Sequence, residues 1–157
     1  MLWLIRHATV KLRLKEPAST WLLDEAGHAA AEEIAVRLAP VPRVLSSPEP
    51  KAVATAEPLA RRSGVAVETD ERLREVERAR NVADYEAHRA AVRAYLDGEP
   101  VEGWEARGDA LARFRAALDG VDDAAVVTHA TVLSLFLGYD LDRWEAIRLP
   151  DVIEWRP

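Results

Sequence analysis

Two histidines that each follow a run of apolar residues are the side chains in this sequence best suited to chemistry. His7 comes after the apolar residues 2–5, and His129 comes close behind the apolar residues 124–127. An imidazole can act as a nucleophile or hold an anion, depending on its protonation. Arg6, directly before His7, adds a planar guanidinium whose donors match the oxygens of a phosphate group. Together these residue types indicate chemistry on an oxyanion.

The elements that must position these residues are buried strands. An apolar run without alternation suits a strand covered on both faces, and ligand sites of open α/β sheets lie beyond the carboxyl ends of strands. The pattern predicts strands at residues 2–5, 43–47, 65–68, 124–129 and 152–155, the last at an edge. It predicts helices at residues 24–38, 50–62, 83–96, 104–118 and 131–137.

This alternation of strands and helices predicts an α/β fold, in which a three-layer α/β/α sandwich surrounds a mostly parallel sheet. We expect residues 1–157 to form a single domain, with a small helical insertion at about residues 78–103. The two histidines would then meet at one rim of the sheet. The turn Ser46-Ser47-Pro48 would join them there, and the amides of the helix that it opens favour an anion. Ser47 fits a helix cap better than a nucleophile, since no base is assigned to it.

Composition narrows the class of partner. The chain has 157 residues, a formal net charge of -6 and no cysteine. The excess of acidic residues argues against nucleic acid as the main partner. A few cations gathered in one pocket can still bind a small phosphorylated ligand. The lack of cysteine excludes disulfides and thiolate metal sites, and the histidines lack metal-ligand spacing, so we expect no metal or cofactor. No membrane-length apolar run or leader is visible, and we expect a cytoplasmic protein without a membrane partner.

The chain resembles a known family, the histidine phosphatase superfamily, also called the phosphoglycerate mutase-like family. The resemblance extends over essentially the whole sequence, with its motifs in the family's order. Those motifs are Arg6-His7-Ala8, Leu23-Asp24-Glu25-Ala26-Gly27, Ser46-Ser47-Pro48 with Lys51-Ala52 and Thr55-Ala56, Gly103-Trp104-Glu105 with Arg113, and Val127-Thr128-His129.

The resemblance implies a metal-independent phosphomonoester hydrolase that acts through a phosphohistidine on His7. Arg6 and His129 would hold the phosphoryl oxygens while charge redistributes during transfer. Glu75 stands where the family has its general acid, and its pKa would have to be raised for it to protonate the leaving oxygen. Without the resemblance, the charged residues 70–80 around Glu75 are more typical of a solvated surface.

Three positions of the phosphate-binding set depart from the family. Lys51 stands where the family has arginine, and lysine keeps the charge but loses the bidentate fork. Val10 and Arg13 stand in place of a threonine and an asparagine, so we expect Thr9 to serve instead and hypothesise that Arg13 supplies the missing guanidinium. Ala130, directly after His129, completes the expected phosphate-binding set.

Three alternatives stay open at this point. The first is a phosphoglycerate mutase-type phosphotransferase, although the chain leaves little room for a larger cap. The second is a phosphohistidine protein phosphatase, and the third is a degenerate, non-catalytic phosphate-binding domain. The expected partner is a small phosphorylated metabolite or a phosphoprotein, whose leaving group would be read by Lys11, Arg13, the two middle helices and residues 78–80. We expect the chain to be a monomer or a homodimer.

Overall fold

The apolar run at the beginning of the chain forms β1 (Leu2–Arg6), an inner strand of a five-stranded sheet in the computed structural model. The structure describes residues 1–79 and 84–156. The sheet has the order β3-β2-β4-β1-β5, and every neighbouring pair is parallel except β1 with β5. The other strands are β2 (Val44–Ser46), β3 (Val67–Thr69), β4 (Ala124–Thr128) and β5 (Asp151–Trp155). The predicted mostly parallel sheet with its final strand at an edge is confirmed.

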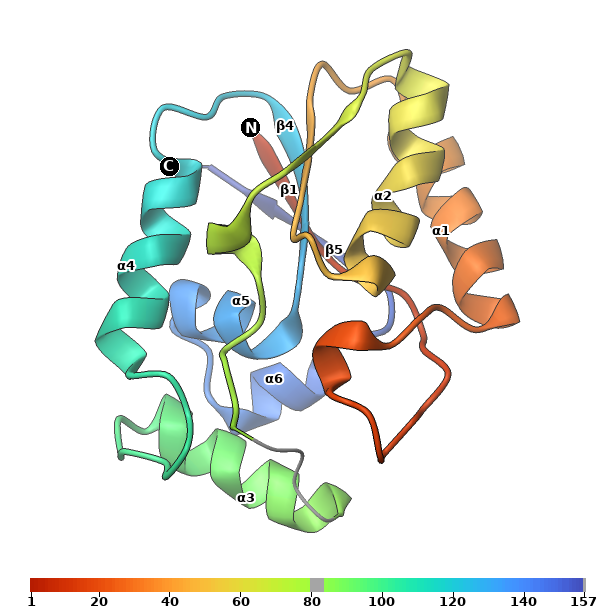
Figure 1. The fold of residues 1–157 in the computed structure, drawn as a ribbon. Coiled ribbons are helices and arrows are strands. Elements are labelled where there is room, and N and C mark those ends of the chain that lie inside the picture. Colours follow the sequence, from red (N-terminus) through yellow and green to blue (C-terminus); the bar gives the residue numbers. More distant parts are fainter. Residues whose placement is uncertain (80–83, 157) are drawn as a thin grey trace.

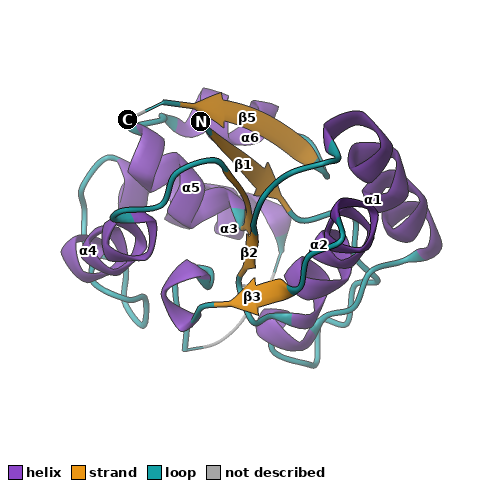
Figure 2. Ribbon diagram, turned by 90° about the horizontal axis from the view of Figure 1, so that it is seen from above, coloured by secondary structure: helices purple, strands orange, loops and turns teal. Residues whose placement is uncertain are grey.

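Helices cover both faces of this sheet, which confirms the predicted three layers (Figures 1 and 2). One face carries α1 and α2, and the other carries the remaining four helices. Their bounds are α1 (Glu25–Leu38), α2 (Pro50–Ser63), α3 (Tyr85–Leu96), α4 (Arg107–Leu118), α5 (Ala130–Leu137) and α6 (Leu141–Ala146).

Two hydrophobic cores, one on each face of the sheet, explain why the strands are apolar without alternation. In β1, Leu4 packs into the core under α3 to α6, whereas its neighbour Ile5 packs into the core under α1 and α2. In β4, Val126 and Val127 divide between the same two cores in the same way. A strand covered on both faces has no position for a polar side chain, which is why the pattern lacks alternation.

The element boundaries differ from the prediction mainly at strand and helix beginnings. The third strand starts at Val67 rather than residue 65, because Gly64 ends α2 in the left-handed region with φ +69°. The fourth helix starts at Arg107 rather than residue 104, because Trp104 forms an isolated bridge with Arg78. Of the predicted insertion at residues 78–103, residues 80–83 lie outside the described residues, and α3 fills much of the rest.

The carboxyl ends of the central strands meet at one rim. The backbone N–H of His7 donates to the Thr128 carbonyl at 3.0 Å, and the N–H of Ser47 donates to the Val127 carbonyl at 2.9 Å. These bonds continue the parallel ladders of the sheet one residue past the strands. They bring the residues that follow β1, β2 and β4 to the same place.

None of the described helices combines the length and the apolar character that a membrane span requires.

Candidate active site

The two imidazoles predicted to share a site lie side by side at this rim. The ring centroids of His7 and His129 are 5.2 Å apart, with the ring planes inclined at 58°. Both side chains are buried, at 8% exposure for His7 and 1% for His129. Residues far apart in the sequence therefore form one compact pair.

The backbone selects the tautomer of His7. Its Nδ1 lies 2.8 Å from the carbonyl oxygen of Ala8. A carbonyl oxygen only accepts hydrogen bonds, so Nδ1 carries the proton and the lone pair of a neutral ring sits on Nε2. Burial lowers the pKa of His7 well below its ordinary value, and the neighbouring His129 and Lys51 lower it further. The ring is thus neutral near pH 7, as a nitrogen nucleophile must be.

His129 is the more deeply buried partner. Its Nε2 lies 2.8 Å from the Ser47 hydroxyl and 3.4 Å from the Glu49 carboxylate. Burial lowers the pKa of His129 to about 3, against the opposing effect of Glu75. Its Nδ1 is buried and has no hydrogen-bond partner within residues 1–79 and 84–156. A buried polar atom in this condition can take part in binding a ligand.

Glu75 lies next to this pair and is held as a carboxylate. Its two oxygens accept hydrogen bonds from the first turn of α5, at 3.1 Å from the N–H of Thr131 and 2.9 Å from that of Val132. Burial raises the pKa of Glu75, but His129, Arg78 and the backbone N–H groups of Val76 and Thr131 outweigh burial and leave the pKa below its usual value. The positive end of a helix favours this ionised form. In this state Glu75 is a base rather than an acid.

The loop that carries Glu75 is fixed by Arg113 on α4. The Arg113 guanidinium donates to the backbone carbonyls of Arg72, Arg74 and Glu75 at 2.8, 2.8 and 3.0 Å. It also forms a bidentate pair with Glu105, with both distances at 2.7 Å. The donors of a guanidinium lie in one plane, so the pair sets the loop's orientation as well as its position.

Arg6 lies behind the pair at the end of β1. Its Nη1 donates to the Ile147 carbonyl at 2.5 Å, and its Nε is buried without a hydrogen-bond partner among the described residues. Burial lowers the pKa of Arg6, while Glu75 and Asp151 raise it. The guanidinium remains charged, because an arginine pKa lies far above neutrality. Arg6 is therefore a fixed cation whose Nε–H remains available as a donor.

Lys51 is paired rather than free. Its ammonium donates to the Glu49 carboxylate and, at 2.6 Å, to the Ala18 carbonyl. Glu49 also accepts a hydrogen bond from the backbone N–H of Glu75 at 3.0 Å. The lysine expected to replace the family's arginine therefore shares its charge with a carboxylate on the same turn of helix.

The remaining predicted phosphate-binding residues are Thr9, Arg13 and Ala130. The Thr9 hydroxyl donates to the Asp24 carboxylate at 2.7 Å, so it supports the cap of α1. Arg13 is exposed and pairs with Glu16 at 3.2 Å, so the structure does not bring it to the histidine pair. Ala130 is buried at the first turn of α5, next to His129.

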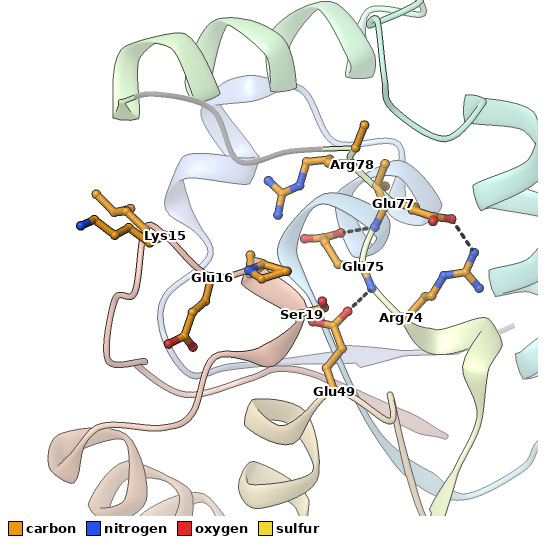
Figure 3. Close-up of a pocket in the computed structure, with 13 residues that line it drawn as sticks. Lys15, Glu16, Ser19, Glu49, Arg74, Glu75, Glu77 and Arg78 are labelled. Atoms are coloured by element: carbon orange, nitrogen blue, oxygen red, sulfur yellow. Dashed lines mark hydrogen bonds and ion pairs between the residues drawn. The ribbon is translucent and has the colours of Figure 1, made fainter.

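Figure 3 shows the residues that line a cavity of about 580 Å³. Neither histidine lines it. Glu49 and Glu75 do, and both interact with His129, so they connect the cavity to the pair. The loop at residues 14–19 and residues 74–79 form its other walls. The cavity is therefore placed to receive the part of a ligand that extends beyond the histidines.

Sequence reasoning assigned no role to Glu49, to Thr55 or to the clamp formed by Arg113. Thr55 accepts a hydrogen bond from the N–H of Ala8 at 3.0 Å and donates to the Lys51 carbonyl, which ties α2 to the loop after His7. The signal that could have pointed to Glu49 is an acidic residue directly after the Ser-Ser-Pro turn. Within residues 1–79 and 84–156, no group of three or more metal-ligating side chains is placed to hold a metal ion.

Comparison with known proteins identifies relatives of this arrangement. The family model of the histidine phosphatase superfamily (branch 1) matches residues 2–153. No curated protein sequence matches the chain. Among solved structures, mycobacterial glucosyl-3-phosphoglycerate phosphatase superposes with a TM-score of 0.66 at 26% identity, covering 93% of this chain and 83% of that one. That phosphatase has also been solved in complex with inorganic phosphate.

Two further structures share the fold at lower identity. A protein from Thermus thermophilus, TTHB049, has a TM-score of 0.72 at 23% identity and covers 98% of this chain and 93% of its own. YhfR from Bacillus stearothermophilus has a TM-score of 0.70 at 20% identity, with coverages of 99% and 91%. These two likenesses establish the architecture alone.

Proposed function

The chain belongs to branch 1 of the histidine phosphatase superfamily, and we therefore propose that it hydrolyses a phosphomonoester through a phosphohistidine on His7. The observation that carries this proposal is the His7 ring itself. Its Nδ1 is committed to the Ala8 carbonyl, and its ring lies 5.2 Å from that of His129. A neutral imidazole fixed in this way presents the Nε2 lone pair as a nucleophile.

In the first step the Nε2 lone pair of His7 attacks phosphorus, and the bond from phosphorus to the ester oxygen breaks. Arg6 and His129 face the phosphoryl oxygens, and their buried, unpartnered nitrogens supply donors as charge redistributes. His129 has to gain a proton to act as a cation, and a bound dianion favours that proton electrostatically. No metal ion enters this step.

The leaving oxygen takes a proton from the carboxyl group of Glu75. In the unliganded site this group is a carboxylate, so the proton must arrive with the substrate, whose negative charge raises the pKa of Glu75. In the second step a water molecule gives a proton back to Glu75 and attacks phosphorus. The phosphorus–nitrogen bond then breaks, which releases inorganic phosphate and restores neutral His7.

Phosphate release from p-nitrophenyl phosphate tests the proposal. We expect turnover by the wild type and a loss of at least about 1000-fold in His7→Ala, because the covalent route disappears. Rapid quenching at alkaline pH, followed by peptide mapping, should find phosphate on His7. A wild type whose rate equals that of His7→Ala would refute the hydrolase.

A non-catalytic phosphate-binding domain is the second candidate, and the Lys51–Glu49 pair is the observation that favours it. A cation neutralised by a carboxylate stabilises a transferring phosphoryl group less than a free arginine does. This candidate predicts that inorganic phosphate binds to the wild type without any turnover of esters. Equilibrium dialysis with phosphate, run beside the ester assay, separates the two functions.

Two further assays test the remaining alternatives. Phosphoryl transfer to 3-phosphoglycerate tests the mutase, and phosphate release from a phosphohistidine protein tests the protein phosphatase.

A further inference from the structure

Arg78 is one of the described cations that line the cavity, with Lys15 and Arg74, and the mechanism above uses none of them. It lies three residues after Glu75 and lines the same cavity. Figure 3 shows its guanidinium above the Glu75 carboxylate, on the opposite side of the cavity from Lys15. The proton donor for the leaving oxygen and this guanidinium thus face the same space.

The Arg78 side chain is held in place by aromatic rings. Its guanidinium lies 5.5 Å from the centroid of the Trp104 ring, and its Nη1 lies 3.3 Å from Nδ1 of His88. His88 itself packs between Trp104 and Trp144, with ring centroids 6.1 and 5.7 Å away. His88 is therefore only partly exposed, although it lies in an alanine-rich helix. A guanidinium stacked on an aromatic face keeps its in-plane donors available.

His88 orients Arg78 without neutralising it. Burial lowers the pKa of His88 to about 4, and Arg78 lowers it as well. The ring is therefore uncharged near pH 7, and its Nδ1 accepts a hydrogen bond from Arg78, which can only donate. Within residues 1–79 and 84–156, no carboxylate lies within ion-pair distance of Arg78, whereas Arg74 in the same wall pairs with Glu77.

The charges around the cavity make Arg78 available to a ligand. Next to the histidines, Lys51 pairs with Glu49, and Arg6 interacts with Glu75 and Asp151. Arg78 adds a further positive charge on the wall that carries Glu75, whereas Lys15 is exposed on the opposite side of the cavity. Arg78 also holds the pKa of Glu75 down, which opposes proton donation until an anion screens it.

We propose that Arg78 is a specificity-determining residue that binds an oxyanion, such as a carboxylate, carried by the leaving group close to the ester oxygen. The proposal rests on the proposed hydrolase for its catalytic part only, because the binding site exists without turnover. The bound oxyanion neutralises Arg78 and so lets Glu75 hold its proton. Esters without such a group bind more weakly and raise the pKa of Glu75 less, because only their phosphate charge acts on it. His88 and Trp104 are positioning residues for Arg78.

Inert phosphonates test the binding part directly. We compare 3-phosphonopropionate with propylphosphonate by isothermal titration calorimetry against the wild type, Arg78→Gln and a matched control, Arg115→Gln, whose arginine is exposed on α4 away from the cavity. The wild type and the control should bind 3-phosphonopropionate about 10-fold or more tightly than propylphosphonate, the gain expected of a charge-assisted hydrogen bond. Arg78→Gln should reduce the preference to within about 2-fold, and Arg78→Lys should restore part of it.

A wild type without preference, or an Arg78→Gln variant that keeps it, would overturn the assignment. Turnover of phosphoglycolate and ethyl phosphate then tests the catalytic part. The ratio of the two kcat/KM values should fall by about 10-fold in Arg78→Gln. In the wild type, the alkaline limb of the kcat profile, where Glu75 loses its proton, should lie at higher pH for phosphoglycolate than for ethyl phosphate. If His7→Ala and wild type show equal background rates while the binding preference stands, the hydrolase fails and the Arg78 site survives.

Discussion

Glu49 and Lys51, which flank Pro50 at the start of α2, form a buried ion pair whose side chains are only 10% and 6% exposed. The pair lies against His129, since a Glu49 oxygen is 3.4 Å from its Nε2. A phosphate group that approaches the histidines therefore meets a carboxylate as well as an ammonium. Burying such a pair costs desolvation free energy, which good geometry and further hydrogen bonds must offset. Here Lys51 donates to the Ala18 carbonyl, and Glu49 accepts from the Glu75 N–H.

Replacing Glu49 by glutamine should tighten phosphate binding. The change keeps the shape and the acceptor for the Glu75 N–H but removes a negative charge beside the anion. One charge at several ångströms, in an effective dielectric near 20, corresponds to roughly 1–2 kcal/mol, or about 10-fold in the inhibition constant of inorganic phosphate. Competitive inhibition or calorimetry measures the effect.

The same variant should be less stable without phosphate, by about 3 kcal/mol, because the buried ammonium of Lys51 loses its counter-ion. Phosphate at high concentration should recover part of the loss, since it supplies the missing charge. Urea unfolding with and without phosphate gives both values. An unchanged inhibition constant would mean that Glu49 does not face the bound anion.

Arg113→Lys should lower turnover by about 10- to 100-fold with a small effect on phosphate affinity. Lysine keeps the charge but cannot hold three carbonyls and a carboxylate in one plane, so the loop bearing Glu75 loses its orientation. Steady-state kinetics and phosphate inhibition separate the two effects. Arg115→Lys, an exposed position on the same helix, is the matched control, and equal losses in both variants would argue against a clamp.

The fold could be predicted from the sequence because its signals are local. Unbroken apolar runs indicated the doubly covered strands β1 and β4, and Gly64 marked the end of α2. The beginning of α4 was predicted less accurately, because the bridge between Arg78 and Trp104 decides it. Such a bridge is a contact between distant residues, which periodicity does not contain.

The candidate site divides in the same way. The meeting of His7 and His129 follows from strand order, and strand order follows from the α/β pattern. The partner of Lys51 and the ionised state of Glu75 could not be read from the sequence, because both depend on which groups packing brings within a few ångströms. The pKa of Glu75 is an example, since His129, Arg78 and the backbone N–H groups of Val76 and Thr131 hold it below its usual value in the unliganded site.

Stability should fall as the pH falls below about 6.5, through the buried imidazoles. Burial lowers the pKa of His129 to about 3 and that of His88 to about 4. The unfolded chain binds protons near pH 6.5, where the folded state does not, so stability is complete above that pH and is lost on acidification. Each ring contributes up to about 1.4 kcal/mol per pH unit. Urea unfolding of wild type and His129→Gln between pH 7.5 and 4.5 should give a shallower slope for the variant, and parallel curves would contradict the assignment.

Gly27→Ala should disturb the loop after His7 from a distance. A Cβ at residue 27 would lie 2.2 Å from the Thr9 carbonyl oxygen, which also accepts the N–H of Asp24, so either the loop or the beginning of α1 must move. We expect a loss of about 2–3 kcal/mol in the free energy of unfolding, as for other overpacked positions, together with reduced turnover.

Gly108→Ala is the matched control for this substitution, because nothing lies within 4 Å of the added methyl group and the residue is helical in α4. There the change should stabilise by about 0.4–1 kcal/mol, since alanine loses less backbone entropy on folding than glycine. Chemical denaturation of both variants decides the point. Equal effects at the two positions would show that the helix, and not the contact with Thr9, sets the cost. Opposite signs would tie the glycine of the first helix to the geometry of the loop that follows the nucleophile.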